Sequence, residues 1–573
     1  MEEATEIVGH FDGYRSGKFV GWAWRPQDPN HLVTVEVVAD GFVIGEGLAS
    51  IYRADLRAAG IGNGFHAYEI PADLNVDRGE PVKVVVRAKD GPVLKDGETE
   101  IGGAPSEEDQ SNPEFKAFVA AVLGQRLPAD AVELPEPSPP IHFMVSCGSN
   151  RDAAQASASG GNEYSYTFVL QAFLPVLERF GAVHVVSDPT EEVDALHEKY
   201  LAGGEVSLFL SFAPPHRTTL GLRCPTIPVI AWEFPTIPTA VWEDDVRHDW
   251  RYVLRQTGRA ITLSTFAARA VKAAMGADFP AVAIPTPVYD RWVGRRTRVR
   301  PMLAAPVSIE IAGFIVDTSG LTFEVGMAIP PHPEPSEDTA SVMLEGVVFT
   351  SVLSPKDGRK NWPDILTAFV MSFRDRPDAT LVLKMIGADA SFWWWEFHDT
   401  LCSLPAFACR VVVLSGFLDD DRYSALLDAS SWVVNASRAE GQCLPLLEFM
   451  CAGCPAIAPA HTAMIDYIDP SNALILESDE EFCIWPHDPR YERTTTRHRV
   501  SWSSLQAAYH EAYMISTRDP DRYRAMAAAA ERTMQAFCSD EVVSAKLDSF
   551  LGLGRSSVPR DGISAMLAAE VAE

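Results

Sequence analysis

Two carboxylates, Glu440 and Glu448, lie in a stretch whose pattern favours a ligand that is both phosphorylated and hydroxylated. Pro445 begins a helical pattern between them, since proline suits the first turn of a helix, where a missing N–H leaves no bond unmade. The free amides of that turn and the positive end of the helix dipole favour a diphosphate. Carboxylates beside a diphosphate suit neutral hydroxyls, as on sugars. A helix-capping acid next to an unrelated surface glutamate would explain the same spacing equally well.

The surrounding residues 431–464 predict the elements that would position these acids. Residues 432–435 form a short apolar run of strand length, Gly453 ends the helix, and residues 455–459 form a second apolar run. Such a β-α-β unit brings a loop and a helix N-terminus to the carboxyl edge of a parallel sheet. Open α/β sheets bind their ligands at that edge.

The same stretch resembles the donor-site motif of retaining family-4-type glycosyltransferases of the GT-B fold, whose pattern runs E-G-F-G-L-P-x-x-E-A-M-A-x-G-x-P. Both acids match this pattern, as do Gly441, Leu444, Pro445, Gly453 and Pro455. Gln442 and Cys443 depart from it, because the family usually has Phe and Gly there. Loop amides near these positions approach the transferred sugar in the family, so the departures leave the identity of the donor sugar open.

The resemblance implies a role for each matching residue. Glu448 would bind the ribose hydroxyls and Glu440 the sugar hydroxyls. The nucleotide-sugar site would also include Gly441, Gln442, Cys443 and Leu444. Arg359 and Lys360 resemble the basic element that neutralises the donor diphosphate, where fixed cations stabilise the charge that develops on the leaving group.

Weaker resemblances concern residues elsewhere in the chain. Gly416 and Leu418 resemble the segment whose backbone holds the nucleotide base, and Gly161 lies in a loop that resembles the glycine-rich loop of the family's first domain. His216 is a candidate contact to the donor sugar, and an exposed loop histidine is the competing interpretation. Glu233, at the end of a predicted strand, is a candidate for facing the acceptor.

Two patterns could suggest a metal or redox site, and both have simpler explanations. The acids at 419–421 begin a predicted helix, whose dipole they complement. Cys451 and Cys454 form a CxxC pattern without a second ligand pair or a thioredoxin-like context, which indicates packing. The resemblance likewise implies no metal and no cofactor, with a nucleotide-diphosphate sugar as the co-substrate.

Positive charges at two other places call for an explanation. Lys384 lies inside an apolar run, so it should either reach solvent along its aliphatic stem or point into the cleft. The second place is a group of four arginines, Arg295, Arg296, Arg298 and Arg300, which could meet an anionic acceptor or lipid headgroups. A cluster that is solvated or paired within the molecule is the more frequent arrangement.

A chain of 573 residues exceeds what a single core usually supports. Alternating strands and helices predict an α/β fold with parallel, doubly wound sheets. The resemblance implies that this fold is of the GT-B type, with two facing Rossmann-like, doubly wound domains. The alternating runs at the N-terminus predict an additional small all-β sandwich-like domain. The predicted divisions are a β-module (1–105), a linker with a short helix (106–140) and the first α/β domain (141–292). They continue with a β-rich insertion that contains a hairpin at 307–327 (293–345), the second α/β domain (346–550) and a flexible tail (551–573).

The β-module contains two hairpin signals, Asp-Gly at 40–41 and at 90–91, each between alternating apolar runs. Trp22 and Trp24 lie two residues apart and therefore face the same side of a strand. They could form a platform on which a sugar stacks. Core packing is the more frequent use of tryptophan and is the prediction made for both.

Composition restricts the environment and the partners of the protein. With 47% apolar and 22% charged residues, the sequence is typical of a soluble globular protein, and its net charge of −30 argues against nucleic acid and against broad binding to anionic lipid. No apolar run is long enough to span a bilayer, and the N-terminus lacks a signal-peptide pattern. We therefore expect a cytoplasmic location, with peripheral contact with the inner membrane left open, and reduced cysteines.

The resemblance implies a retaining, metal-independent glycosyltransferase of the hexosyltransferase type. It would move a sugar from a nucleotide-diphosphate sugar to a glycan, lipid-linked or protein acceptor in bacterial surface polysaccharide or glycoconjugate synthesis. Two alternatives remain: a non-catalytic carbohydrate-binding or scaffold protein with a transferase-like core, and a GT-B phosphorylase, which would need a site for inorganic phosphate.

Overall fold

The computed structural model describes residues 7–101, 141–147 and 162–552, with gaps at 16–17, 29–31, 40–41, 54–55, 57–58, 60, 62–64, 72–81, 90, 298, 334–338, 387–388, 392 and 487. The chain forms two compact units, Met1–Ser138 and Pro139–Glu573. Each unit is described by itself. The predictions for the linker 106–140, for Gly161 and for nearly all of the tail lie outside the described residues.

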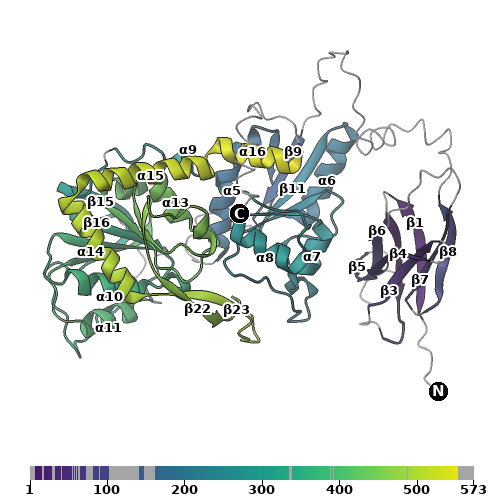
Figure 1. Cartoon of the computed structure of the whole chain (residues 1–573), viewed down its shortest axis with the longest axis horizontal. Coiled ribbons are helices and arrows are strands. Elements are labelled where there is room, and N and C mark those ends of the chain that lie inside the picture. Colours follow the sequence, from purple (N-terminus) through teal and green to yellow (C-terminus); the bar gives the residue numbers. More distant parts are fainter. Residues whose placement is uncertain are drawn as a thin grey trace, which may run out of the picture. The chain divides into compact units, whose positions relative to one another are not determined.

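The first unit is all-β, as predicted (Figure 1). Its strands are β1 (Val8–Arg15), β2 (Lys18–Trp24), β3 (Thr34–Ala39), β4 (Phe42–Leu48), β5 (Ile51–Tyr52), β6 (Phe65–Pro71), β7 (Val82–Ala88) and β8 (Val93–Ile101). They follow the order β4-β3-β7-β8-β1-β2-β6-β5. The pairs β3–β4 and β7–β8 are antiparallel on either side of the two Asp-Gly positions, which confirms both hairpins.

The prediction of core packing for Trp22 and Trp24 is wrong. On β2 the buried positions are Phe19, Gly21 and Ala23, and the alternation of side chains puts both tryptophans on the opposite face, where they are half-buried. Gly21 has a steric reason to lack a side chain, because a Cβ there would lie 2.4 Å from the hydroxyl oxygen of Tyr68.

The second unit begins with a six-stranded parallel sheet of order β10-β9-β11-β12-β13-β14. Its strands are β9 (Ile141–Ser146), β10 (Ala182–Val185), β11 (Val206–Phe212), β12 (Thr226–Ile230), β13 (Ala260–Thr262) and β14 (Ala281–Ala283). The helices between them are α5 (Asn162–Glu178), α6 (Pro189–Ala202), α7 (Trp250–Thr257) and α8 (Thr265–Met275). The apolar runs at 141–147, 182–186, 206–212, 226–232 and 260–263 predict β9 to β13, which the structure confirms. The short β14 was not predicted.

A second sheet follows in the order β15-β18-β17-β16-β19-β20-β21, parallel except for β15. Its strands are β15 (Leu303–Asp317), β16 (Thr339–Leu353), β17 (Ala379–Ile386), β18 (Arg410–Phe417), β19 (Trp432–Val434), β20 (Ala456–Ala458) and β21 (Ala473–Ile475). Around it lie α9 (Tyr289–Trp292), α10 (Trp362–Phe373), α11 (Trp394–Ser403), α12 (Asp420–Ala429), α13 (Leu444–Cys451), α14 (Trp502–Arg518), α15 (Pro520–Cys538) and α16 (Asp540–Leu551). A separate hairpin joins β22 (Ser478–Cys483) and β23 (Thr495–Val500).

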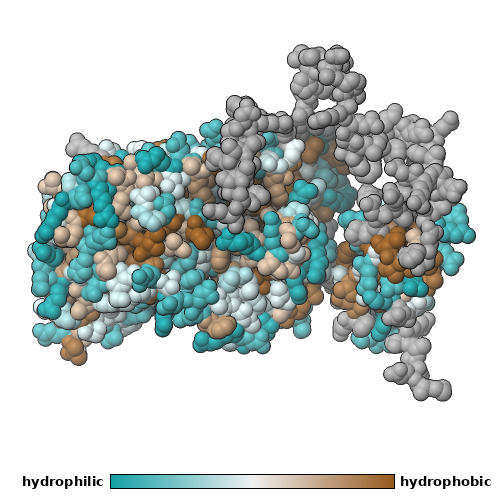
Figure 2. Space-filling view, viewed as in Figure 1, coloured by the Kyte–Doolittle hydropathy of each residue, from teal (hydrophilic) through white to brown (hydrophobic). Residues whose placement is uncertain are grey.

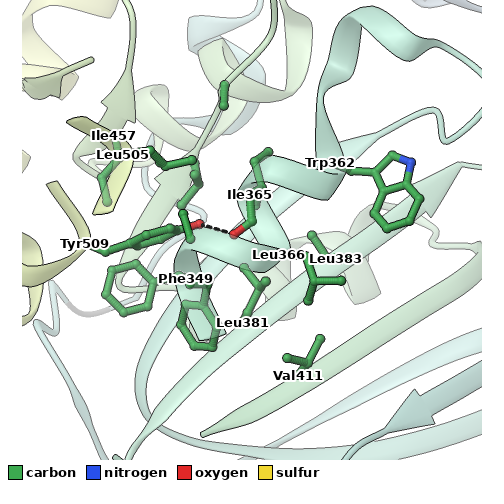
Figure 3. Packing of buried hydrophobic residues seen from close by; sticks show 14 of the residues in the cluster. Phe349, Trp362, Ile365, Leu366, Leu381, Leu383, Val411, Ile457, Leu505 and Tyr509 are labelled. Atoms are coloured by element: carbon green, nitrogen blue, oxygen red, sulfur yellow. Dashed lines mark hydrogen bonds between the residues drawn. The ribbon is translucent and has the colours of Figure 1, made fainter. Parts of the chain in front are cut away.

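Aromatic and aliphatic side chains bury one face of this second sheet (Figure 3). Phe349 of β16 contacts Tyr509 of α14 edge-to-face, with ring centroids 5.3 Å apart. The hydroxyl of Tyr509 donates to the carbonyl oxygen of Ile365 on α10 at 3.2 Å, so the buried polar group is satisfied. On the visible face of this unit, Figure 2 shows a mostly hydrophilic or intermediate surface with hydrophobic side chains in small groups.

The insertion contains a hairpin, but not at 307–327 as predicted. Residues 303–312 of β15 pair with the first half of β16, and residues 312–317 then pair with β18. Gly313 and Gly416 meet where β15 reaches β18, both with positive φ, and a Cβ on either would lie 2.1 Å from a carbonyl oxygen of the opposite strand. The sequence predicted strand structure in this region but not the pairing of the second half of β15 with β18, which lies about a hundred residues further along the chain.

Two arginines of the same region, Arg296 and Arg300, serve the fold. Arg296 is buried and donates to the carbonyl oxygens of Gly453 and Ser430, each at 2.8 Å, and to the hydroxyl of Tyr523. Arg300 pairs with Asp428 at 3.6 Å. The suggestion that these two bind an anionic acceptor or lipid is therefore wrong, and Arg298 lies outside the described residues.

The C-terminal helices connect the two sheets of the second unit. Helix α15 packs against α13, and α16 returns to α5, where Val543 and Leu547 enter the hydrophobic core of the first sheet (Figure 1). Two doubly wound α/β domains joined in this way form the predicted GT-B fold. No helix within the described residues is long and apolar enough to cross a membrane.

Candidate active site

The loop before α13 has the backbone that the motif's glycine would favour. Cys443 occupies the N-cap position of α13 with φ 67°, in the left-handed region that glycine adopts without steric cost. Pro445 lies in the first turn, and Gly453, with φ 71°, follows the end of the helix. Cys443, which stands where the motif has glycine, therefore adopts a backbone conformation that favours glycine.

Glu440 forms the centre of a buried ion pair in this loop. Lys360, on the short 3-10 helix η3 (Gly358–Lys360), donates from Nζ to both carboxylate oxygens of Glu440 at 2.8 Å. Asn435 donates to Oε1 at 3.3 Å, and the backbone N–H of Glu440 donates to Thr462 at 3.1 Å. Glu440 is only 4% exposed; burial opposes its ionisation, but Lys360 holds its pKa below the ordinary value. Glu440 is therefore a fixed anion.

Arg359, the neighbour of Lys360, joins the two α/β domains. Its Nε and Nη2 donate to the two carboxylate oxygens of Asp357 at 3.1 and 2.7 Å, and its Nη1 donates to Glu233, which follows β12 in the first domain. Burial and the nearby acids Asp357 and Glu440 raise the pKa of Glu233, although Arg359 opposes that shift. Arg359 itself stays protonated, because these carboxylates raise its pKa despite burial.

Glu448 lies on α13 in different surroundings. Its Oε2 accepts a hydrogen bond from the hydroxyl of Tyr423 on α12 at 2.7 Å. Burial raises the pKa of Glu448 to about 7, and the Tyr423 hydroxyl and Arg291 only partly offset this shift. Arg291 is itself paired with Asp420 at 2.8 Å.

Lys384 forms a hydrogen bond to the backbone at the start of the segment 416–418. The Nζ of Lys384 donates to the carbonyl oxygens of Met385 at 2.9 Å and Gly416 at 2.7 Å. Burial lowers the pKa of Lys384 to about 7. The prediction that Lys384 reaches solvent or points into the cleft is therefore wrong, because its ammonium is bound to backbone carbonyls. Leu418 is half-buried beside Phe417, which is 50% exposed.

The loop residues that depart from the motif lie at the junction of the two domains. Gln442 accepts a hydrogen bond from Thr286 of the first domain through its side-chain oxygen, and its carbonyl oxygen accepts one from Tyr467 at 2.7 Å. Its buried Nε2 has no hydrogen-bond partner among the described residues. A Cβ on Gly441 would lie 3.1 Å from the backbone nitrogen of Trp232, and Leu444 packs against the cores of both sheets.

His216 lies on the 3-10 helix η1 (Pro215–Arg217) of the first domain. Its Nδ1 accepts a hydrogen bond from Trp250 at 3.2 Å, and its ring lies beside that of His248. The acids at 419–421 behave as helix-start residues: Asp419 caps α12 and Asp420 pairs with Arg291. Within the described part of the chain, no group of three or more His, Cys, Asp or Glu could hold a metal ion, and all nine cysteines are free.

The structure thus gathers Glu440, Lys360 and Arg359 in one buried cluster, places Glu448 separately on the same helix unit, and leaves His216 beside aromatic rings. Sequence reasoning missed four residues that bond to the candidate site residues: Asp357 to Arg359, Asn435 to Glu440, Thr286 to Gln442 and Tyr423 to Glu448. Asp357 carried a usable signal, since an acid two residues before Arg359 at a helix start is a typical N-cap. The others are single polar residues whose partners are distant in sequence.

Comparison with known proteins connects this geometry to a family. Residues 345–484, which contain η3, β18 and α13, match the family described as "Glycosyl transferases group 1". The chain therefore contains a glycosyltransferase domain. A search of curated proteins gave no match.

Several solved structures are similar to the chain in fold. Sucrose-phosphate synthase from Thermosynechococcus elongatus is 13% identical with a TM-score of 0.45, covering 72% of this chain and 98% of that one. The Anabaena protein HepE, solved in complex with UDP, is 14% identical with a TM-score of 0.42, covering 72% and 99%. The N-terminal domain of trehalose-6-phosphate phosphatase from Candida albicans is 11% identical with a TM-score of 0.41, covering 72% and 98%.

Proposed function

We propose that the protein is a retaining glycosyltransferase that takes a sugar from a nucleoside-diphosphate sugar. The observation that carries this proposal is the buried cluster of Glu440, Lys360 and Arg359 within a segment that matches a glycosyltransferase family. Two adjacent cations suit a diphosphate, and the ionised carboxylate between them and the helix suits sugar hydroxyls.

In the proposed donor complex, Arg359 and Lys360 bind the diphosphate, and Glu440 accepts hydrogen bonds from hydroxyls of the sugar. Glu448 binds the ribose hydroxyls, and the backbone at Gly416 and Leu418 faces the base. The unpartnered Nε2 of Gln442 would donate to an oxygen of the sugar, because Thr286 already bonds to the side-chain oxygen.

Transfer with retention then needs little from the protein beyond charge and position. The bond between the anomeric carbon and the phosphate oxygen breaks while the acceptor hydroxyl bonds to the same face of that carbon. The departing phosphate oxygen takes the acceptor's proton, so no protein base is required. Lys360 and Arg359 stabilise the charge on the leaving diphosphate. The side chains of Arg359, Lys360 and Glu440 are only 17%, 21% and 5% exposed at the domain junction, which limits the access of water and therefore hydrolysis.

We propose no metal and no further cofactor for this reaction, since the two cations can neutralise the diphosphate. The acceptor is a glycan, a lipid-linked saccharide or a protein, and the setting is assembly of bacterial surface polysaccharide or glycoconjugates in the cytoplasm or at the inner face of the inner membrane. These finer assignments rest on the family resemblance.

The test is a thermal-shift panel of nucleoside-diphosphate sugars with uracil, guanine and adenine bases, each run with and without EDTA. A true donor at 100 times its Kd should add about 2.7 kcal/mol to the free energy of unfolding. The same donor should also hydrolyse slowly, releasing a nucleoside diphosphate. Stabilisation by no member of the panel would favour the scaffold alternative, and stabilisation by inorganic phosphate with a glycan alone would favour a phosphorylase.

A further inference from the structure

The ion pair between Arg359 and Glu233 crosses from one α/β domain to the other. Glu233 lies just after β12 of the first sheet, and Arg359 lies on η3 after β16 of the second. Both side chains are shielded, with relative exposures of 17% for Arg359 and 11% for Glu233. A buried charge pair is costly to desolvate, so this contact is a weak source of stability and calls for a different role.

The guanidinium of Arg359 binds two carboxylates, one within its own loop and one in the other domain. Asp357 takes the edge formed by Nε and Nη2, and it also accepts the backbone N–H of Arg359 at 3.0 Å as the N-cap of η3. That contact lies within one loop. Glu233 takes Nη1, the remaining outward donor, and it belongs to the other domain. Only the Glu233 edge can be vacated without unfolding the loop.

The charge balance also calls for a carboxylate to leave when a diphosphate arrives. The cluster contains three carboxylates and two cations: Glu233, Asp357, Glu440, Arg359 and Lys360. With all five ionised, the cluster has an excess of one negative charge, and a diphosphate would add more. Glu440 is held within the second domain by Asn435 and Thr462, so it cannot be the group that leaves.

We propose that Glu233 occupies, in the donor-free protein, the edge of Arg359 that the donor diphosphate takes, and that donor binding displaces it. Glu233 is then a latch between the domains that imitates a phosphate oxygen. This inference rests on the proposed function and adds a regulation of the same site. Release of Glu233 would also free the neighbouring contacts across the junction, in which Gly441 lies against Trp232 and Gln442 bonds to Thr286.

The decisive variant is Glu233→Gln, which keeps the size of the side chain and removes its charge. The matched control is Asp466→Asn, because Asp466 also crosses the junction, accepting the backbone N–H of Thr265 at 2.8 Å, and lies outside the cluster. Calorimetric titration with UDP, GDP and ADP should show binding by E233Q about tenfold tighter than by the wild type. The D466N variant should bind as the wild type does.

A second measurement does not depend on nucleotide. Hydrogen exchange of the ligand-free proteins should be faster in E233Q than in the wild type at segments 231–237 and 354–361, and unchanged there in D466N. Equal exchange in E233Q and the wild type overturns the latch, as does equal or weaker nucleotide binding by E233Q, or equal tightening in D466N. Faster exchange together with no nucleotide binding by any of the three proteins supports the latch and contradicts the proposed function instead.

Discussion

Glu440 and Glu448 belong to the same β-α unit, yet they lie in opposite electrostatic surroundings. Glu440 shares both carboxylate oxygens with Lys360, and its pKa lies below the ordinary value although burial alone would raise it. Glu448 accepts a hydrogen bond from Tyr423, and burial raises its pKa to about 7. At neutral pH the first is an anion, whereas the second is divided between charged and neutral forms.

The difference comes from an element that the motif does not contain. Lys360 follows β16, and the parallel pairing of β16 with β19 brings η3 beside the loop, although Lys360 precedes Glu440 by 80 residues. The spacing within a motif therefore predicts where two acids lie, and tertiary pairing decides their charge. In the proposed donor complex, the anion is suited to several sugar hydroxyls, and the half-protonated acid can both accept from and donate to ribose.

Removing the two cations should have the largest effect, because it abolishes the charge compensation that distinguishes Glu440. In the double variant Arg359→Gln, Lys360→Gln, we expect nucleoside-diphosphate affinity to fall by about 10³-fold, since truncating one member of a desolvated charge pair costs about 2–5 kcal/mol. Calorimetric titration measures the loss. Arg291→Gln is the matched control beside Glu448 and should change affinity by less than about threefold. Unchanged binding in the double variant would contradict the diphosphate role.

Glu440→Gln keeps the shape of the side chain and removes the anion. We expect kcat to fall by about 10²–10³-fold, the cost of losing one preorganised group at a reacting centre. Circular dichroism and thermal unfolding should show a folded protein. Glu448→Gln should lower kcat much less below pH 7, where the native acid is largely neutral. Equal losses in the two variants at pH 6 would remove the proposed difference between the acids.

The stability of the protein should depend on pH through Glu448. Its carboxyl ionises near 4.5 in an unfolded chain and near 7 in the folded protein, so folding takes up a proton between these values. The contribution of Glu448 to wild-type stability should therefore fall as pH rises from 4.5 to 7 and level off above. Urea unfolding at pH 8 should find Glu448→Gln more stable than the wild type by about 3 kcal/mol, and at pH 4 nearly equal. A constant difference between the two pH values would show that Glu448 does not titrate in this way.

Local patterns predicted much of the fold and of the loop before α13. Continuous apolar runs identified the parallel strands, which are buried on both faces, and Pro445 and Gly453 bounded α13 to within a residue or two. The same patterns misplaced the hairpin of the insertion, because β15 exchanges β16 for β18 halfway along its length. Long-range pairing of this kind leaves no signal in a short window of sequence.

Polar contacts were harder to predict than strands. Lys384 was recognisable as an unusual charge in an apolar run, but the carbonyl of Gly416 that receives it lies 32 residues later. The ion pair between Glu233 and Arg359 spans 126 residues and two domains. Each residue was noticed separately, and only the structure pairs them. Cys443 is a similar case, since its departure from the motif was noticed in the sequence, and only the structure shows its left-handed backbone.

Cys443→Gly should have the smallest effect. This variant tests whether backbone strain or side-chain packing governs the position before α13. A left-handed conformation costs a non-glycine residue about 1–2 kcal/mol, so glycine should raise the free energy of unfolding by about 1 kcal/mol after loss of the contact between Asn435 and the Cys443 sulfur. The control is Cys451→Gly on α13, where φ is not positive and the buried side chain fills the core. That variant should lose stability. Glu448, a turn further along the helix, should keep its pH dependence in Cys443→Gly, because none of its contacts involves the loop. Destabilisation of Cys443→Gly as large as that of Cys451→Gly would mean that packing, rather than backbone strain, governs this position.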